Sequence, residues 1–235
     1  MRIVTWNCCM GLHGKLAELE GLGADVVIVQ ECAAPDVPRM KDVYAGASTF
    51  LWFGDEPNKG IAILSYGEYR LEALSPGAAT DPKFVIPVKV KGPTSFLLLA
   101  VWAQGGDRKG SYVAKTFEVM GSYAEIIRRE PTVVAGDFNS SSVWDHESSP
   151  NHSDLVERLK GLGLVSAYHW HAEQDQGGEL HPTFHLQWNI MKPYHLDYVF
   201  VPATWSIEDV QVGIAEEWLK CSDHCPVSVD VVVLG

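Results

Sequence analysis

The chain has 235 residues, of which 46% are hydrophobic and 20% are charged, and 18 Lys+Arg against 30 Asp+Glu give a formal net charge of −12. A chain of this length can bury a large core without disulfide staples, and we expect one domain over residues 1–235. The net negative charge repels polyanions. Tight binding of long duplex DNA is therefore excluded unless a basic patch or a metal ion offsets this repulsion.

The five cysteines are odd in number and scattered, which favours free thiols in a reducing compartment over a disulfide framework. Met1 and Arg2 lead at once into a strand-like run without the apolar segment of a signal peptide, and no stretch of about 18 apolar residues occurs. We therefore expect a cytoplasmic protein with no membrane span, and nothing in the sequence implies an obligate protein partner.

Apolar runs rich in β-branched residues recur along the whole chain, each bounded by Gly, Pro or polar clusters, which is typical of strands in a buried sheet. In chain order the predicted strands are 2–6, 26–30, 60–64, 85–90, 96–102, 132–135, 164–167, 194–201, 207–212 and 227–233.

Helices are fewer. The clearest is predicted over 111–129, where apolar side chains recur every three or four residues on one face; they are Val113, Phe117, Met120, Ala124 and Ile127. Shorter helices are predicted over 15–20 and 154–160, the second with Ser153 as its N-cap. Strands this apolar must be buried on both faces, which predicts two sheets packed face to face with helices outside.

Several apolar strands end abruptly in acids, amides or imidazoles. These residues are Asn7, Gln30 and Glu31, Asp137 and Asn139, His195 and Asp197, and Asp223 and His224. Any one of them could be only a turn-forming group. If the carboxylates converge at one edge, however, their like charges destabilise the fold unless a cation neutralises them. Carboxylate and amide oxygens suit a hard divalent ion, so we expect Mg²⁺ or Mn²⁺.

The sequence supports a zinc site in the same region less well than a site for Mg²⁺ or Mn²⁺. Cys221 and Cys225 bracket His224, but no second Cys pair occurs elsewhere, and we interpret both as buried thiols.

The order of the motifs resembles the endonuclease/exonuclease/phosphatase superfamily, which includes exonuclease III, the apurinic/apyrimidinic endonucleases, DNase I and the inositol polyphosphate 5-phosphatases. The motifs are Trp6-Asn7, Gln30-Glu31, Gly136-Asp137-Phe138-Asn139, Leu196-Asp197-Tyr198-Val199-Phe200 and Ser222-Asp223-His224. They span the chain from Asn7 to His224. The resemblance implies a four-layered α/β sandwich, DNase I-like, with two mainly antiparallel sheets face to face and helices outside.

The resemblance also implies a metal site. Glu31 would be the main ligand, with Asn7 and Asp223 beside it.

The remaining motif residues would act on water and phosphate. Asp137 would position and activate the attacking water, and Asn139 would donate to the phosphate. His224 would stabilise the phosphoryl oxygen that gains charge, and Asp197 would hold its ring in one tautomer.

Three positions depart from the family pattern. After the strand 96–102 a His or Tyr is usual, but this chain has Trp102, which either stacks on a substrate ring or packs in the core. Cys9 stands where many nuclease members carry Asp or Asn. The late motif usually begins with Arg, and here His195 replaces it.

Five histidines crowd into the segment 168–195, together with Trp170, Trp188 and Tyr194. One reading makes them imidazoles on exposed strand faces and loops. The other makes His185 or His195, with Lys192, replace the missing cationic groups around the phosphate, with Trp188 as a further substrate contact.

We therefore predict a metal-dependent phosphohydrolase, specifically a nuclease that hydrolyses phosphodiester bonds in DNA by metal-assisted water attack. A phosphatase or phosphodiesterase acting on a small phosphate ester is the alternative, because it tolerates the negative charge better. A binding module without catalysis is a further alternative. The clustered acids argue against it, because they are costly to bring together without use.

Overall fold

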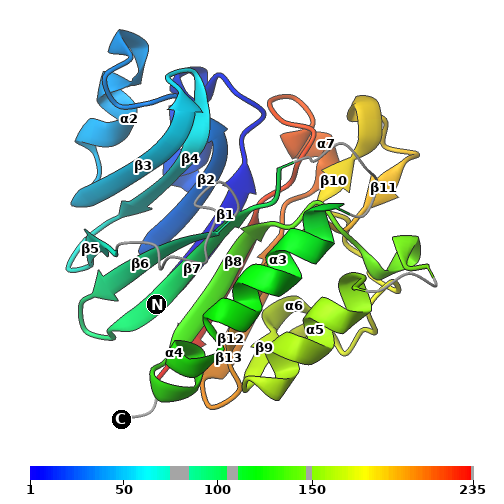
Figure 1. Cartoon of the computed structure of the whole chain (residues 1–235). Coiled ribbons are helices and arrows are strands. Elements are labelled where there is room, and N and C mark those ends of the chain that lie inside the picture. The colour runs from blue at the N-terminus through cyan, green and yellow to red at the C-terminus, as the bar shows by residue number, and fades with distance from the viewer. Residues whose placement is uncertain (75–84, 105–110, 147–149, 234–235) are drawn as a thin grey trace.

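The computed structural model describes residues 1–74, 85–104, 111–146 and 150–233 as two six-stranded sheets with helices (Figure 1). The first sheet has the order β13-β14-β1-β2-β4-β3, and the second has the order β5-β6-β7-β8-β12-β9. Strands of the first sheet are β1 (Arg2–Asn7), β2 (Val26–Cys32), β3 (Thr49–Glu56), β4 (Lys59–Ser65), β13 (Ser206–Val212) and β14 (Val227–Val232). Strands of the second are β5 (Arg70–Ala73), β6 (Val85–Lys91), β7 (Phe96–Trp102), β8 (Thr132–Asp137), β9 (Leu164–Ser166) and β12 (Asp197–Pro202).

Each sheet has a parallel pair of strands at its centre, β1–β2 in the first and β7–β8 in the second, and all other pairings are antiparallel. Parallel neighbours run in the same direction, so their carboxyl ends finish at one edge of the sheet. The repeated arrangement therefore gives each sheet two adjacent strand ends at which polar side chains can meet.

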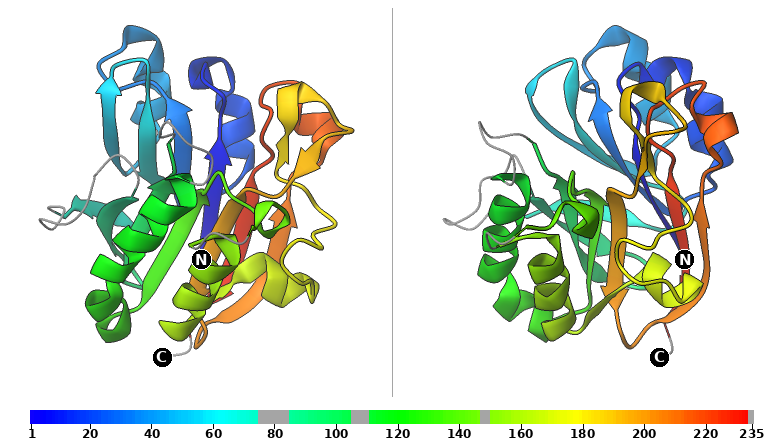
Figure 2. Two further views of the ribbon diagram at one scale, coloured as in Figure 1. Left: turned by 45° about the vertical axis from the view of Figure 1, so that its right-hand side comes forward. Right: turned by 90° about the vertical axis from the view of Figure 1, so that its right-hand side faces the viewer.

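Helices cover the outer faces of both sheets (Figure 2). The helices α1 (Leu16–Gly21) and α2 (Lys41–Ala45) pack on the first sheet, and α3 (Ser111–Ser122), α4 (Ala124–Arg129) and α5 (His152–Gly161) pack on the second. Of two further helices, α6 (Ala167–Ala172) follows β9 in the chain and packs against β12 and β13, and α7 (Ala215–Trp218) lies between β13 and β14 in the chain. The predicted four-layered sandwich is confirmed.

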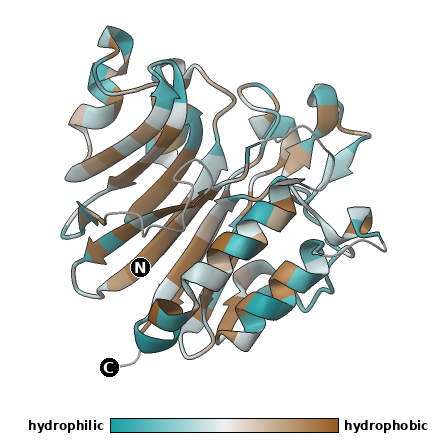
Figure 3. Ribbon diagram, in the orientation of Figure 1, coloured by the Kyte–Doolittle hydropathy of each residue, from teal (hydrophilic) through white to brown (hydrophobic). Residues whose placement is uncertain are grey.

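The strand β7 explains why the apolar runs were continuous. Phe96, Leu98 and Ala100 belong to the core between the sheets, whereas Leu97 and Leu99 pack under the helices. Both faces of the strand are buried, so neither face carries polar residues (Figure 3).

The predicted helix 111–129 is wrong in one respect, because it is two helices. It breaks at Tyr123, whose φ of −89° and ψ of 0° separate α3 from α4. Arg158 donates to the carbonyl of Phe117 at 2.9 Å, and a Cβ on Gly121 would meet the guanidinium of Arg158 at 2.5 Å. The glycine that admits this arginine is also a poor helix former, which weakens the helix just before the break.

The other boundaries shift by one to three residues for identifiable reasons. Helix α5 begins at His152 rather than 154, because the N-cap is Asn151, whose N–H donates to the Asp154 carboxylate at 2.9 Å. The strand predicted from 194 begins at Asp197, because Tyr194 instead ends a two-stranded hairpin. This hairpin consists of β10 (Phe184–His185) and β11 (Pro193–Tyr194).

The strands β3 and β5 were not predicted. Both lie at sheet edges, and β3 is half-exposed along most of its length, so it lacks a continuous apolar run. In the part of the chain that the structure describes, no helix is both long enough and apolar enough to span a bilayer.

Candidate active site

Three of the predicted site residues lie at the ends of strands β1, β8 and β12. Asn7 ends β1, Asp137 ends β8, and Asp197 begins β12 opposite Asp137 in the antiparallel register. The amide of Asn7 donates to the carboxylate of Asp137 at 3.0 Å, which joins the first sheet to the second. Three of the predicted residues, Asn7, Asp137 and Asp197, therefore lie together at these strand ends.

Asp137 is buried, with 1% of its surface exposed, among amide donors. Besides Asn7, it accepts from the backbone N–H of Asn139 at 2.9 Å and from the Asn139 side-chain amide at 3.0 Å. Burial, together with the charge of Asp197, raises the pKa of Asp137 to about 7 against the opposite effects of His224 and the amide donors. Asp137 is thus a carboxylate whose proton affinity is matched to neutral water chemistry.

The residue before this carboxylate must be glycine. Gly136 has a φ of +151°, and a Cβ there would lie 1.8 Å from the carbonyl oxygen of Val101 on the neighbouring strand. No side chain fits into this contact without moving the backbone of β7. The close approach of the two strands fixes where β8 delivers Asp137.

Asp197 and His224 form a buried ion pair. His224 donates from Nδ1 to Oδ2 of Asp197 at 2.8 Å, and the two side chains are 5% and 0% exposed. Burial alone lowers the pKa of His224, but the charge and hydrogen bond of Asp197, with Asp137 and Asp223, raise it to about 9. The ring is therefore an imidazolium at neutral pH, and Nε2 remains as its other donor.

A short segment that sequence reasoning missed holds this pair in place. The hydroxyl oxygen of Thr183 accepts from the N–H groups of Leu196 at 2.9 Å and Asp197 at 3.0 Å. The carbonyl of the same threonine accepts from Cys225 N–H at 2.7 Å. A lone threonine in a polar stretch carries no periodicity or motif that could have indicated this role.

The next residue along, Phe184, packs on the catalytic candidate itself. Its ring centroid lies 4.6 Å from that of His224, and the two residues form an isolated β-bridge. The backbone N–H of His185 then donates to the carbonyl of Asp223 at 2.8 Å. Three consecutive residues therefore bind both halves of the Asp–His pair and its flanking loop.

The other side of the site is more open. Glu31 sits on a β-bulge with a φ of +60°, which turns its side chain out of the otherwise buried strand β2. Its carboxylate lies 3.3 Å from the ammonium of Lys59, and Asp223 is half-buried. The Cys9 thiol lies near both acids: burial raises the pKa of Cys9 to about 11, and the charges of Asp223 and Glu31 add to the rise.

Two groups of residues could hold a metal ion. Among the described residues, one donor atom from each of Asp137, Asp197 and His224 lies within 4.8 Å of the other two. In that group, however, Nδ1 of His224 and Oδ2 of Asp197 are already bonded to each other.

The second group is the predicted one, Glu31 with Asn7 and Asp223, and it offers only oxygens. Oδ1 of Asn7 accepts from Cys9 N–H at 3.0 Å and keeps a second lone pair. A hard divalent ion fits this donor set.

The predicted substrate-binding residues differ in how exposed they are. Trp188 is 46% exposed at the tip of the hairpin with a φ of +59°, and Lys192 is exposed on the same hairpin. His185 and His195 are each only 2% exposed, so the reading of exposed imidazoles is wrong for these two. Burial lowers the pKa of both rings, to about 4 for His195, which leaves them uncharged at neutral pH. Their contact with a phosphate stays a prediction that their placement does not support.

Asn139, the predicted donor to the phosphate, donates its side-chain amide hydrogens to other acceptors in the structure. Its side-chain amide donates to the carbonyl of Ala103 at 2.9 Å as well as to Asp137. Both amide hydrogens therefore have acceptors, and the residue positions the carboxylate. Donation to a phosphate stays a prediction that requires one of these bonds to be exchanged.

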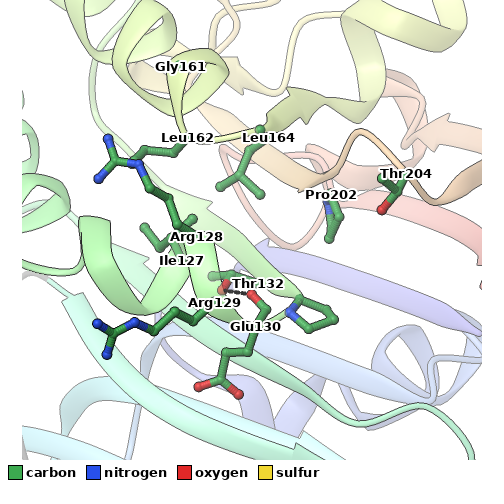
Figure 4. Close-up of a pocket in the computed structure, with 12 residues that line it drawn as sticks. Ile127, Arg128, Arg129, Glu130, Thr132, Gly161, Leu162, Leu164, Pro202 and Thr204 are labelled. Atoms are coloured by element: carbon green, nitrogen blue, oxygen red, sulfur yellow. Dashed lines mark hydrogen bonds between the residues drawn. The ribbon is translucent and has the colours of Figure 1, made fainter.

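A cavity of about 490 Å³ lies away from these residues (Figure 4). It is lined by Arg128, Arg129 and Thr132, and Thr132 begins the strand that Asp137 ends. The cavity is therefore at the opposite end of β8. A second cavity, of about 420 Å³, is lined by Lys59 and Trp102 and adjoins Glu31.

Comparison with known proteins places the fold. Residues 120–224 match the Endonuclease/Exonuclease/phosphatase family, and no curated protein matches the sequence significantly. The chain resembles an AP endonuclease from Archaeoglobus fulgidus, with a TM-score of 0.74 at 20% identity over 99% of this chain and 100% of that one. It also resembles the 3′ phosphatase NExo from Neisseria bound to a product DNA hairpin, with a TM-score of 0.73 at 19% identity over 99% of both chains. The human nocturnin catalytic domain with bound sulfate gives 0.68 at 16% identity, covering 100% of this chain and 93% of that one.

At these identities the structural likeness establishes the fold. The family match adds sequence evidence, because residues 120–224 contain the last three of the five motifs. The first two motifs end the paired strands β1 and β2 at the same edge. Residues 120–224 thus resemble the Endonuclease/Exonuclease/phosphatase family in sequence, and the whole chain has the fold of the structures that it resembles.

Proposed function

We propose that this protein is a divalent-metal-dependent nuclease that hydrolyses phosphodiester bonds in DNA. The observation that carries the proposal is the buried Asp197–His224 pair beside Asp137, at 2.8 Å between Nδ1 and Oδ2. An ion pair this deeply buried is costly to maintain, and replacing it with apolar residues is often neutral or stabilising. Its presence at the strand edge is better explained by chemistry than by stability.

Each residue of the buried side has a task in water attack on phosphorus. The Asp137 carboxylate, oriented by Asn7 and Asn139, accepts the proton of the attacking water. The His224 imidazolium places a positive charge and an N–H donor against the phosphoryl oxygen that gains charge. Asp197 orients that ring by accepting from Nδ1, which leaves Nε2 as the other donor.

The open side supplies the metal ligands. Glu31 would hold the ion, with Oδ1 of Asn7 and the Asp223 carboxylate beside it. When bound, such an ion supplies positive charge to the phosphoryl oxygens. Mg²⁺ and Mn²⁺ are the candidates, because all the donors are oxygens and Mg²⁺ keeps several waters as ligands.

Similar proteins support DNA as the substrate. One is described as a 3′ phosphatase bound to a product DNA hairpin, and another as an AP endonuclease. A small phosphate ester is the second candidate, because the net charge of −12 disfavours a long polyanion more than a small one. Five free cysteines support a reducing, cytoplasmic location.

The test is cleavage of end-labelled single-stranded, duplex and abasic-site DNA in Mg²⁺, Mn²⁺ or EDTA. We expect cutting that needs the metal and disappears in His224→Ala. The matched control is His171→Ala, since that ring lies 3.8 Å from Asp209 outside the site and is 37% exposed. Absence of cutting on every DNA, with turnover of a small phosphoester, would move the assignment to the second candidate.

A further inference from the structure

A cavity between the sheets adjoins the open side of the site. It has a volume of about 420 Å³, and we call it the Trp102 pocket. Phe53 and Ile61 form apolar walls from β3 and β4, and Gln104 follows β7 at its margin. Its volume falls in the range of roughly 300–1,000 Å³ that is typical of small-molecule sites, and its lining is the usual mixture of apolar walls with a few polar groups.

The indole of Trp102 links this pocket to the reacting centre. Trp102 is the last residue of β7 and pairs with Asp137 across the parallel ladder. Its ring is 6% exposed and lines the pocket. A planar group held against this indole therefore lies one strand away from the carboxylate that activates water.

Lys59 provides a cation at the junction of pocket and site. Its ammonium lies 3.3 Å from Oε2 of Glu31 and 5.5 Å from the centroid of the Trp102 ring. The side chain is 42% exposed, so its flexible stem can turn toward an incoming anion. The phosphate-binding cation that sequence reasoning sought in His185, His195 and Lys192 thus has a candidate on β4.

Acidic residues also line the pocket. Asp55 and Glu56 are exposed at the end of β3, and Glu56 pairs with Lys59 across the β3–β4 ladder. Lys59 is the cation of this set that lies near the indole of Trp102. The neighbouring indole and ammonium suit an occupant that carries both an aromatic ring and a phosphate.

We propose that the Trp102 pocket binds the base of a terminal nucleoside, with Lys59 against the phosphate that is hydrolysed. The enzyme then prefers nucleotide esters and strand ends to phosphodiesters without a base. This inference rests on the proposed function and narrows its substrate class. It also explains the departure from the family pattern at Trp102, where an aromatic face replaces a phosphate-contacting group.

Two esters with the same leaving group test the preference. Thymidine 5′-(p-nitrophenyl phosphate) carries a base, and methyl p-nitrophenyl phosphate does not. We expect wild-type kcat/KM to be at least about tenfold higher for the thymidine ester, on the scale of one base–aromatic stack. The ratio should fall toward one in Trp102→Leu and stay unchanged in Trp170→Leu, a control tryptophan that is 67% exposed on α6.

A binding measurement keeps the inference falsifiable if Trp102→Leu folds poorly. Equilibrium dialysis of thymidine 5′-monophosphate in EDTA compares wild type with Lys59→Met, whose mutated side chain is largely outside the core. We expect the variant to bind at least about fivefold more weakly. Equal binding by the two proteins would remove Lys59 from the subsite.

The two proposals fail in different ways. Equal kcat/KM for the two esters in wild type would overturn the subsite and leave the hydrolase intact. Failure to cleave either ester or any DNA would overturn the proposed function. In that case the dialysis still decides about the pocket: nucleotide binding that Lys59→Met weakens supports it, and no binding by wild type overturns it.

Discussion

The two sides of the site differ in how deeply their charged groups are buried and in whether each charge has a counter-ion within the fold. On one side Asp137, Asp197 and His224 are all buried, and the imidazolium offsets the carboxylate that it contacts. On the other side Glu31 and Asp223 are half-buried, and the Lys59 ammonium near Glu31 is itself 42% exposed. A buried charge must carry its counter-ion within the fold, whereas a half-exposed one can take it from solution. We infer that the buried side keeps its charged groups paired as a fixed part of the fold. The half-exposed side is where we propose that a metal ion binds and exchanges with solution.

The largest expected effect comes from removing the imidazolium. His224→Ala leaves the Asp197 carboxylate buried without a partner, which costs about 3–5 kcal/mol of unfolding free energy. It also removes a charge-stabilising donor, which costs roughly 10²–10³ in turnover. Urea unfolding and kcat measured together test this claim. A variant of normal stability would show that the pair is not the permanent element we describe.

Glu31→Gln should affect activity and leave stability nearly intact. Turnover falls by roughly 10²–10³ if the carboxylate holds the metal that stabilises the phosphoryl charge. The lost ion pair with Lys59 is partly exposed and contributes at most about 1 kcal/mol. The same two measurements apply. A stability loss as large as that of His224→Ala would erase the contrast between the two sides.

Thr183→Val sharpens the account of the buried side, because it keeps the shape of the side chain and removes only the acceptor. Two buried N–H groups, of Leu196 and Asp197, lose their partner, and each costs roughly 1–3 kcal/mol. Displacement of Asp197 should lower kcat about tenfold or more. Thr183→Ser should restore both stability and kcat, and failure of this rescue would reduce the threonine to a packing residue.

The smallest effect is a pH dependence of stability behind the buried side. Burial lowers the pKa of His152 from 6.5 to about 4. In the unfolded chain this ring is protonated below pH 6.5, whereas in the folded protein it is protonated only below about pH 4. The histidine therefore makes the fold less stable as pH falls through that interval. His224 has the opposite sign: its raised pKa stabilises the fold below pH 6.5, and this contribution is lost as pH rises through about 9.

The measurement compares unfolding free energies of wild type and His152→Gln by urea titration at pH 7.5 and pH 5. The wild type should lose about 2 kcal/mol relative to the variant between these values. Asp137, whose pKa is raised to about 7, titrates in the same interval, but it is present in both proteins and cancels in the difference. A pH-independent difference would mean that His152 is not held neutral.

The sequence predicted the features that depend on short segments of chain. Runs such as 96–102 identified buried strands because both faces of β7 pack against apolar layers. Residues at strand ends predicted the candidate site, because parallel strands deliver their carboxyl ends to one edge.

Features that depend on distant partners were missed. Lys59 is one charge at the start of an apolar run, and only the register of β2 with β4 brings it to Glu31. Arg158 is likewise distant in sequence from the Phe117 carbonyl to which it donates, shortly before the break at Tyr123. Neither arrangement leaves a local pattern in the sequence.

The measurement that tests the division of the site most directly is Mn²⁺ binding by calorimetry to wild type, Glu31→Gln and His224→Ala. We expect Glu31→Gln to bind Mn²⁺ at least about tenfold more weakly than wild type, because a carboxylate ligand becomes neutral. It predicts that His224→Ala binds Mn²⁺ about as well as wild type. Retained binding in Glu31→Gln with loss in His224→Ala would place the metal among Asp137, Asp197 and His224, and would contradict the account.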